Sequence, residues 1–311
     1  MVESKHSWKA WLYLAPAIIL LLIFTVWPII NTLRMAFLEG YSSMSAVGGA
    51  VYSLGLGNFK QVLEYKDFLR CLSNTMLLCV LTVPLSTILA LLIAVCLNAI
   101  KPFQRLLQTI FFLPYVTNSI AIGMVFEAMF NIIGLSPDAA SAESWGIINN
   151  IIGLFGMDPV NWINMNSGYW PNIWVMVFYI VWNALPFKIL ILLGGLQSIN
   201  KQYYDAAKVD STPRVRVFTK ITVPLLSPML AYVVITGFIG GFKEYSSIVG
   251  IFGDDMKAVG TDHSLNTMVG YIYEALGNNE GRASAAALIL FAIIFVVTMI
   301  NLYVSKKKTH Y

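Results

Sequence analysis

The sequence predicts an all-α membrane protein with six transmembrane helices. Of its 311 residues, 58% are hydrophobic and 12% are charged, whereas soluble domains average about 25% charged residues. Six apolar stretches reach the length of about 20 residues that a helix needs to cross the hydrocarbon of a bilayer. A third observation, the uneven distribution of Lys and Arg between the connecting segments, predicts how these helices are oriented.

The predicted spans are separated by polar segments. They cover residues 11–37, 71–97, 106–132, 172–193, 225–248 and 283–303. Lys5 and Lys9 precede the first span as they would a signal peptide, but the span is too long for one and shows no small-x-small cleavage site. We therefore expect the first span to remain as a membrane anchor.

The basic residues predict that both termini are cytoplasmic. With the N-terminus inside, 12 of the 20 Lys and Arg residues fall in cytoplasmic segments. The long segment 133–169 on the opposite side contains Asp138, Glu143 and Asp158 but no Lys or Arg. This segment and residues 249–282 are predicted to be external, and "PVNWINMNSGYWPN" within the first is predicted to fold back as an amphipathic cap over the bundle.

The residue types that carry chemistry are sparse. Cys71, Cys79 and Cys96 share one apolar stretch without metal-ligand spacing, and the three histidines are scattered. The phosphate-binding pattern GxxxxGK[ST] is absent from the sequence. Because the basic residues are placed as topology signals, we expect no nucleic-acid partner. The sequence predicts no catalytic residue, no metal site and no cofactor bound by this chain.

Residues 197–224 form the longest predicted cytoplasmic segment between spans, and we call residues 201–224 within it the elbow. The sequence from Gln202 to Asp210 favours a helix. Within it, Ala206 and Ala207 are small enough to let another surface approach closely. We expect this small-residue face to contact a partner.

The second half of the elbow is predicted to form another helix. Ser211 or Thr212 can cap it, with Pro213 at its first position, where proline is favoured. Pro224 and Pro228 mark the return into the membrane. A loop that only sets topology would explain the five basic residues of the elbow, but not the small-residue face or the paired prolines.

The elbow resembles a known motif. "DAAKVD" followed by "FTKITVPLLSP" is similar to the EAA loop of permease subunits in binding-protein-dependent ABC importers. The matching residues are Asp205, Ala206, Ala207, Asp210, Phe218, Ile221 and Pro224. Asp205 stands where the family usually has Glu, and Ser211 stands where it usually has Gly. We therefore expect the turn at Ser211 to avoid a backbone conformation that only glycine tolerates.

The resemblance covers most of the chain. "LGGLQSINKQYYDAAK" is similar to the run-in to this loop in the carbohydrate branch, of the maltose and glycerol-phosphate type, and "WLYLAPAIILLLIFTVWPII" resembles that branch's extra N-terminal span. After the fifth span, this chain has "IFGDDMKAVGTDHSLNTMVGYIY" where the branch often carries Gly-Gly-Pro. A glycerol phosphate or a polyol therefore remains an alternative to a sugar or oligosaccharide.

The resemblance implies a type I ABC importer permease fold in a prokaryotic plasma membrane. Residues 1–70 would form an N-terminal helix and external loop, 71–305 the five-helix core with its coupling loop, and 306–311 a basic cytoplasmic tail. The implied partners are a second, homologous permease, two cytoplasmic ATPase subunits that use ATP and Mg, an external solute-binding protein and a carbohydrate substrate. The contact with the ATPase would involve Asp205, Ala206, Ala207, Asp210 and Ser211.

The solute path is expected where polar groups lie at membrane depth, because such groups are costly there and so mark function. The polar candidates are Glu127, Asn183, Lys188, Lys243, Glu244 and Ser246, and the candidate aromatic partners of a sugar are Trp182, Phe242 and Tyr245. We expect Lys188 to extend towards the cytoplasmic interface. Glu127 could instead bond within the bundle, and Lys243 and Glu244 could pair with another span. The glycines of "GFIGGFKEYSS" permit either close helix packing or a local break.

Two other classes of protein would fit a multi-span chain. A self-sufficient secondary transporter or channel would need no ATPase and would leave the elbow without a purpose. A membrane enzyme should cluster His, Asp or Glu at one membrane face, and the sequence shows no such cluster. Co-purification of a soluble ATPase would distinguish an importer from a secondary transporter.

Overall fold

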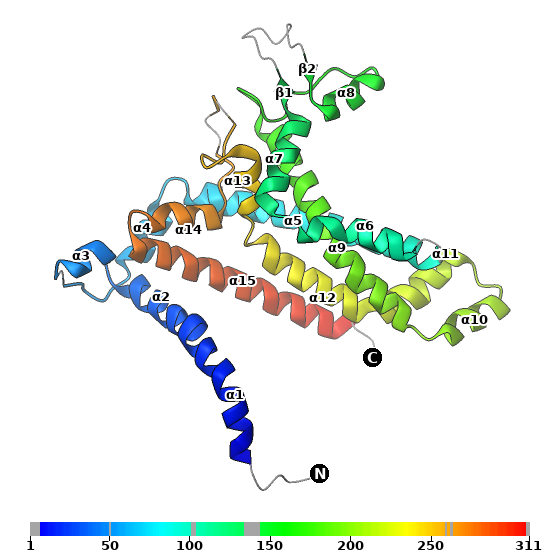
Figure 1. Ribbon diagram of the computed structural model, residues 1–311, viewed down its shortest axis with the longest axis horizontal. Helices are drawn as coiled ribbons and strands as arrows, with labels where there is room; N and C mark the ends of the chain where they lie inside the picture. The colour runs from blue at the N-terminus through cyan, green and yellow to red at the C-terminus, as the bar shows by residue number, and fades with distance from the viewer. Residues whose placement is uncertain are drawn as a thin grey trace. The chain divides into compact units, whose positions relative to one another are not determined.

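The computed structural model describes residues 7–49, 51–100, 104–133, 144–258, 260–261 and 264–308. The described chain is helical, apart from two short antiparallel strands, β1 (Ile132–Ile133) and β2 (Ser144–Trp145) (Figure 1). The sequence-based expectations for Lys5, Lys101, Asp138, Glu143 and the end of the basic tail lie outside the described residues.

The helices follow the apolar pattern of the sequence. In chain order they are α1 (Ser7–Leu21), α2 (Trp27–Phe37), α3 (Ser43–Val47), α4 (Gly57–Glu64), α5 (Phe68–Ala99), α6 (Gln104–Val116), α7 (Ser119–Phe130), α8 (Ile147–Leu154), α9 (Tyr169–Ser198), α10 (Lys201–Val209), α11 (Arg214–Val217), α12 (Val223–Gly241), α13 (Ser246–Phe252), α14 (Met268–Leu276) and α15 (Glu280–Lys308). Short π-helical segments join α1 to α2 at Leu22–Val26 and α11 to α12 at Phe218–Thr222.

The described chain contains five unbroken helical stretches that are long and apolar enough to cross a membrane. They are Trp8–Phe37, Phe68–Ala99, Tyr169–Ser198, Arg214–Gly241 and Glu280–Lys306. A sixth span is possible if the bent pair of helices α6 and α7 crosses the membrane as one unit. The prediction of an all-helical, multi-span membrane protein is confirmed at this level.

The third predicted span is not one straight helix. The chain turns by 106° between Thr109–Val116 and Ser119–Phe130. Asn118 causes the break, because its side chain accepts hydrogen bonds from the backbone N–H groups of Ile120, at 2.9 Å, and Ala121, at 3.2 Å. Such an N-cap begins a new helix, α7, rather than continuing the old one.

The fifth predicted span, 225–248, is also broken. Helix α12 ends at Gly241, and α13 begins only at Ser246. Glu244 lies in the break and accepts a hydrogen bond from the Ser247 hydroxyl at 2.5 Å. The glycines in this stretch could have allowed either close helix packing or a local break, and the structure shows a local break.

The stretch that was predicted to fold back as an amphipathic cap packs on the apolar cluster of α9 through Ile163, which is buried, and Trp162. The amphipathic helix of this region is α8, which precedes the quoted stretch. Residues 159–168 form a loop, and Tyr169 begins the long helix α9. Side chains bond to the backbone of this loop: Asn149 of α8 binds Val160 at both the N–H and the carbonyl oxygen, and the Asn161 amide donates to the Met165 carbonyl oxygen.

The structure divides into two compact units, which we describe separately. The first comprises Met1–Phe68 and Gly270–Phe291. Its centre is the fully buried Asn58, whose amide donates to the carbonyl oxygens of Ala36 at 3.1 Å and Leu38 at 2.7 Å. One polar side chain thereby satisfies backbone groups that the end of α2 leaves without partners.

The second unit comprises Leu69–Val269 and Ala292–Tyr311 and contains the candidate sites. Helix α9 is its central element, with buried residues such as Tyr179 and Leu192 in two separate apolar clusters. The boundaries at residues 70 and 305 that the resemblance implies stay predictions.

Helices α7 and α13 cross with their backbones in contact. A Cβ atom added to Gly123 would lie 2.6 Å from the Cα of Gly250, which is closer than real atoms approach. The crossing is further fixed by the Tyr179 hydroxyl of α9, which donates to the Ser119 carbonyl oxygen at 2.7 Å. Only glycine at both positions allows this packing without displacement of a helix.

Candidate functional site

The first candidate site is a cavity of about 290 Å³ lined by α5, α6, α9 and α12, which we call the four-helix cavity. Its polar lining consists of Thr82, Ser86, Asn183, Lys188, Thr236 and Glu244. Gly237, Gly240 and Gly241 of α12 form one wall, where the absence of side chains leaves space. A cavity with mixed apolar and polar walls at this depth can hold a hydrogen-bonding solute.

Lys188 is buried in the wall of this cavity. Its side chain is 4% exposed, and its ammonium nitrogen donates to the hydroxyl oxygens of Ser86 at 2.7 Å and Thr87 at 3.0 Å. A third bond runs to the Val83 carbonyl oxygen at 3.2 Å. Both hydroxyls donate to backbone carbonyls of their own helix, so each must accept from Lys188. The expectation that Lys188 extends to the interface is therefore wrong, because three acceptors on α5 hold it inside.

Three of the predicted path residues, Asn183, Lys188 and Glu244, line the four-helix cavity. The aromatic candidates do not. Phe242 is 1% exposed, Tyr245 packs against an apolar cluster, and Trp182 packs on the Phe126 ring with centroids 5.3 Å apart. Sugar stacking in this cavity by these three rings is therefore not supported, because their surfaces are covered by the chain itself or lie outside the cavity lining.

The remaining polar candidates lie away from this cavity. Lys243 and Ser246 are exposed, and the expected pairing of Lys243 with another span is not present among the described residues. Glu127 lines a second cavity of about 470 Å³, which we call the α7–α13 cavity. Asn131, Asn164 and Lys257 line it as well.

The sequence reasoning missed the hydroxyl groups of the four-helix cavity. Thr82 and Ser86 are four residues apart on α5 and so share one face of that helix. Ser and Thr within apolar helices are common because they satisfy themselves on a backbone carbonyl four residues earlier. The pattern in the sequence that could have identified them is the four-residue spacing of Thr82 and Ser86, on the helix that faces Lys188.

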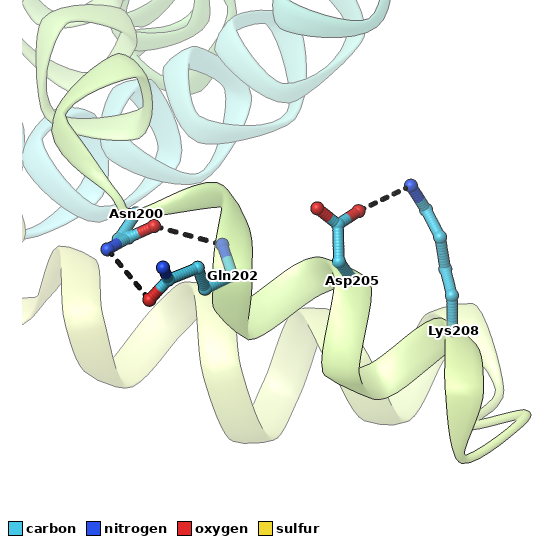
Figure 2. A network of polar contacts seen from close by, with 4 residues as sticks. All are labelled: Asn200, Gln202, Asp205 and Lys208. Atoms are coloured by element: carbon cyan, nitrogen blue, oxygen red, sulfur yellow. Dashed lines mark hydrogen bonds and ion pairs between the residues drawn. The ribbon is translucent and has the colours of Figure 1, made fainter.

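The second candidate site is the elbow. Its first helix, α10, begins at the N-cap Asn200, whose side chain accepts from the Gln202 N–H at 3.0 Å (Figure 2). Asp205 and Lys208 form an exposed ion pair at 3.0 Å on one side of the helix. An exposed pair of this kind contributes only a few tenths of a kcal/mol, so the N-cap and the turn that follows define the helix more strongly.

The turn after α10 corrects one expectation. Ser211 has φ of +52°, the left-handed conformation that the sequence reasoning expected it to avoid. The Ser211 N–H donates to the Lys208 carbonyl oxygen at 3.0 Å, and the Thr212 N–H donates to that of Ala207 at 2.9 Å. These two bonds form a Schellman motif, which ends a helix with a left-handed residue. The turn thus keeps the geometry that suits glycine, although serine occupies it.

A further expectation about the elbow, the cap of its second helix, is wrong. Pro213 is the N-cap of α11, and neither Ser211 nor Thr212 caps that helix, because the tight turn directs the chain straight into Arg214. Ala207 is 6% exposed, and its contact with a partner stays a prediction. Of the two small residues, Ala206 is the exposed one.

The rest of the elbow is anchored to the span that follows. The Tyr204 hydroxyl lies 3.2 Å from that of Thr222 in the π-helical segment. Phe218, Ile221 and Pro224 are partly buried. The elbow therefore presents Asp205, Ala206, Asp210 and Ser211 outwards on a helix that is tied to the membrane span.

Comparison with known proteins places the chain in a family. Residues 82–310 match the family described as binding-protein-dependent transport system inner membrane component. The lactose transport system permease protein LacF of Rhizobium radiobacter is 27% identical over 301 residues, 96% of this chain and 94% of that protein. The arabinooligosaccharides transport system permease protein AraP of Bacillus subtilis (strain 168) is 29% identical over 306 residues, 96% of this chain and 90% of that protein.

A solved structure supports the fold. The crystal structure of a bacterial alginate ABC transporter in complex with an alginate pentasaccharide-bound periplasmic protein contains a chain similar to this one. The TM-score is 0.76 at 23% identity, with 99% of this chain and 98% of that chain covered. Because the family match covers most of the sequence, the chain belongs to the binding-protein-dependent transport system inner membrane components and is a multi-pass permease subunit of an ABC importer, not itself an enzyme.

Proposed function

We propose that this permease, together with a second homologous permease, forms the membrane path for a sugar or oligosaccharide that an external binding protein delivers. Two partner ATPase subunits would supply the energy, since the sequence has no phosphate-binding loop. Both termini and the elbow would be cytoplasmic, as the distribution of Lys and Arg indicates. The names of the relatives, which include lactose and arabinooligosaccharide permeases, support a carbohydrate.

The observation that carries the proposal is the outward face of the elbow. Tyr203 and Val209 expose large apolar side chains three residues before and after the small Ala206 on α10, and Val215 of α11 is also exposed. Exposed apolar groups at such a density mark a surface that binds another protein, and a short helix suits a groove on the partner. A capped helix that is tied to the span through Tyr204 and Thr222 can transmit movement of that partner into the membrane.

The four-helix cavity would hold part of the solute path. Asn183 and Thr236 offer both donors and acceptors, and Glu244 offers acceptors. Lys188, the cation of the cavity lining, already uses all three N–H groups on α5. It is therefore poorly placed to bind a phosphate, which favours a neutral saccharide over a glycerol phosphate.

An uptake assay tests the proposal. Cells that express the complete transport system would be given radiolabelled lactose, maltose, trehalose and arabinotriose, with and without this chain. We expect at least one saccharide to enter only when the chain is present. Uptake of labelled glycerol phosphate alone would reassign the solute.

The coupling role of the elbow needs its own variant. Ala206→Arg adds a large charge to the exposed face of α10 and leaves its buried face intact. Ala99→Arg, at an exposed position at the end of α5, is the matched control. We expect uptake to be lost in the first variant and kept in the second, at equal amounts of protein in the membrane.

A further inference from the structure

The α7–α13 cavity lies in the second unit and is not used by the proposed path. Its volume of about 470 Å³ falls within the range of about 300–1,000 Å³ that small-molecule sites occupy. Three segments form it: the C-terminal end of α7, residues 163–165, and residues 251–258. Phe252 contributes an aromatic side chain to the wall.

The polar groups of this cavity suit a neutral, polyhydroxylated ligand. Glu127 supplies a carboxylate, Lys257 an ammonium group, and Asn131 and Asn164 two carboxamides. The charges of the lining cancel, so the cavity does not select for an ion. Among the described residues, neither Glu127 nor Lys257 forms an ion pair or a side-chain hydrogen bond, and both keep their bonding capacity for a ligand.

The loop on one side of the cavity is held in place before any ligand binds. The Asn164 amide donates to the Asn131 side-chain oxygen at the end of α7. The Asn164 N–H donates to the Asn161 side-chain oxygen at 3.1 Å, and the Asn161 amide donates to the Met165 carbonyl oxygen at 2.9 Å. A preorganised wall lowers the entropy that a ligand would lose on binding.

The α7–α13 cavity and the four-helix cavity share no lining residue. Gly123 and Gly250 lie at the crossing of α7 and α13, where the two backbones touch. In the proposed topology the α7–α13 cavity opens outwards, because its loops belong to the external segments. A solute that arrives from outside would meet this cavity before the crossing opens.

We propose that the α7–α13 cavity binds one unit of a neutral saccharide outside the α7–α13 crossing, as a separate reception site for the solute. The inference rests on the proposed function for the chemical class of its ligand. The carboxylate of Glu127, the carboxamides of Asn131 and Asn164, and the ammonium of Lys257 hold the sugar hydroxyls, and Phe252 covers an apolar face of the ring.

Cysteine protection tests the site directly. Met165→Cys places a thiol on the cavity wall, and Met157→Cys places one in the same external segment but outside the lining. The two positions are 59% and 56% exposed, which makes them matched. Both variants are made in a Cys96→Ser background, since Cys71 and Cys79 are buried. The complete transporter, without its binding protein, is labelled in proteoliposomes with a membrane-impermeant maleimide.

The probe is the saccharide of the uptake panel that enters cells, with mannitol as the osmotic control and an alginate oligosaccharide as the acidic control. At ten times its Kd, the neutral saccharide should slow labelling of Met165→Cys about tenfold. It should leave Met157→Cys unchanged, and Glu127→Gln should weaken the protection several-fold. Protection by the acidic oligosaccharide alone would contradict the neutral class.

The outcomes separate the two proposals. Uptake into cells without protection of Met165→Cys would overturn the reception site and leave the importer assignment intact. Equal protection at both positions would also overturn it, since the effect would not be local. If no saccharide of the uptake panel enters cells and none protects Met165→Cys from labelling, the saccharide assignment and the reception site are both wrong.

Discussion

Removal of the Ser86 hydroxyl should expose how strongly α5 holds the buried ammonium of Lys188. Ser86 accepts from Lys188 at 2.7 Å, and the lysine side chain is 4% exposed. A hydrogen bond to a charged group is worth about 1.5–3 kcal/mol. Ser86→Ala leaves two acceptors, Val83 and Thr87, around three N–H groups. The free energy of unfolding should therefore fall by about 1.5–3 kcal/mol.

The same substitution is also made in a Lys188→Met background, which removes the buried charge. In Lys188→Met, the Ser86 hydroxyl keeps its bonds to the Thr82 and Val83 carbonyl oxygens of its own helix, which involve no charged group, so Ser86→Ala should then cost less than about 1 kcal/mol. The difference between the two backgrounds is the coupling energy, about 0.5–3 kcal/mol. Ser198→Ala is the control, because among the described residues that hydroxyl bonds only to the Gly195 carbonyl oxygen of its own helix.

The assay is reversible unfolding of the purified permease in mixed micelles, followed by circular dichroism as the fraction of SDS rises. The wild type, both single variants and the double variant are compared under one condition. Additive effects within about 0.5 kcal/mol would refute the reasoning. That result would mean that Lys188 finds other partners in the membrane and that the three bonds to α5 do not hold it.

Two further predictions concern backbone positions. Ser211→Gly should relieve a left-handed backbone conformation that costs residues other than glycine about 1–2 kcal/mol. Amide hydrogen exchange across residues 203–212 should therefore slow about fivefold to thirtyfold. Unchanged exchange would contradict the Schellman turn. Gly250→Ala places a Cβ 3.0 Å from the Gly123 Cα and should lower stability in the same SDS assay by about 1–3 kcal/mol. Gly194→Ala is its control, because an added Cβ there meets nothing within 4 Å, and equal effects of the two variants would refute the close crossing.

The apolar spans could be predicted because membrane helices need long runs of apolar residues, and that requirement acts on each run separately. The break at Asn118 could not, because one capping side chain hardly changes the mean hydropathy of its segment. The break around Glu244 could be predicted only as one of two alternatives, since the glycines allowed either close helix packing or a turn.

The elbow could be located in the sequence from its charges, its small residues and its prolines. Which of its side chains are exposed could not be predicted. Whether Ala206 or Ala207 points outwards depends on how α10 packs against its own chain. For the same reason the sequence could not reveal the bonds from Lys188 to Ser86 and Thr87, which join α9 to α5 across about 100 residues of sequence. Contacts of this kind are set by tertiary packing and leave no local pattern.

The most direct test of the account is transport by the purified complex in proteoliposomes. The vesicles would contain this permease, its partner permease and the two ATPase subunits, with the binding protein and labelled saccharide on one side and ATP on the other. The account predicts that the saccharide crosses only with both ATP and the binding protein present, and that Ala206→Arg abolishes transport while Ala99→Arg does not. Transport by this chain alone, without ATP, would contradict the account and indicate a self-sufficient transporter.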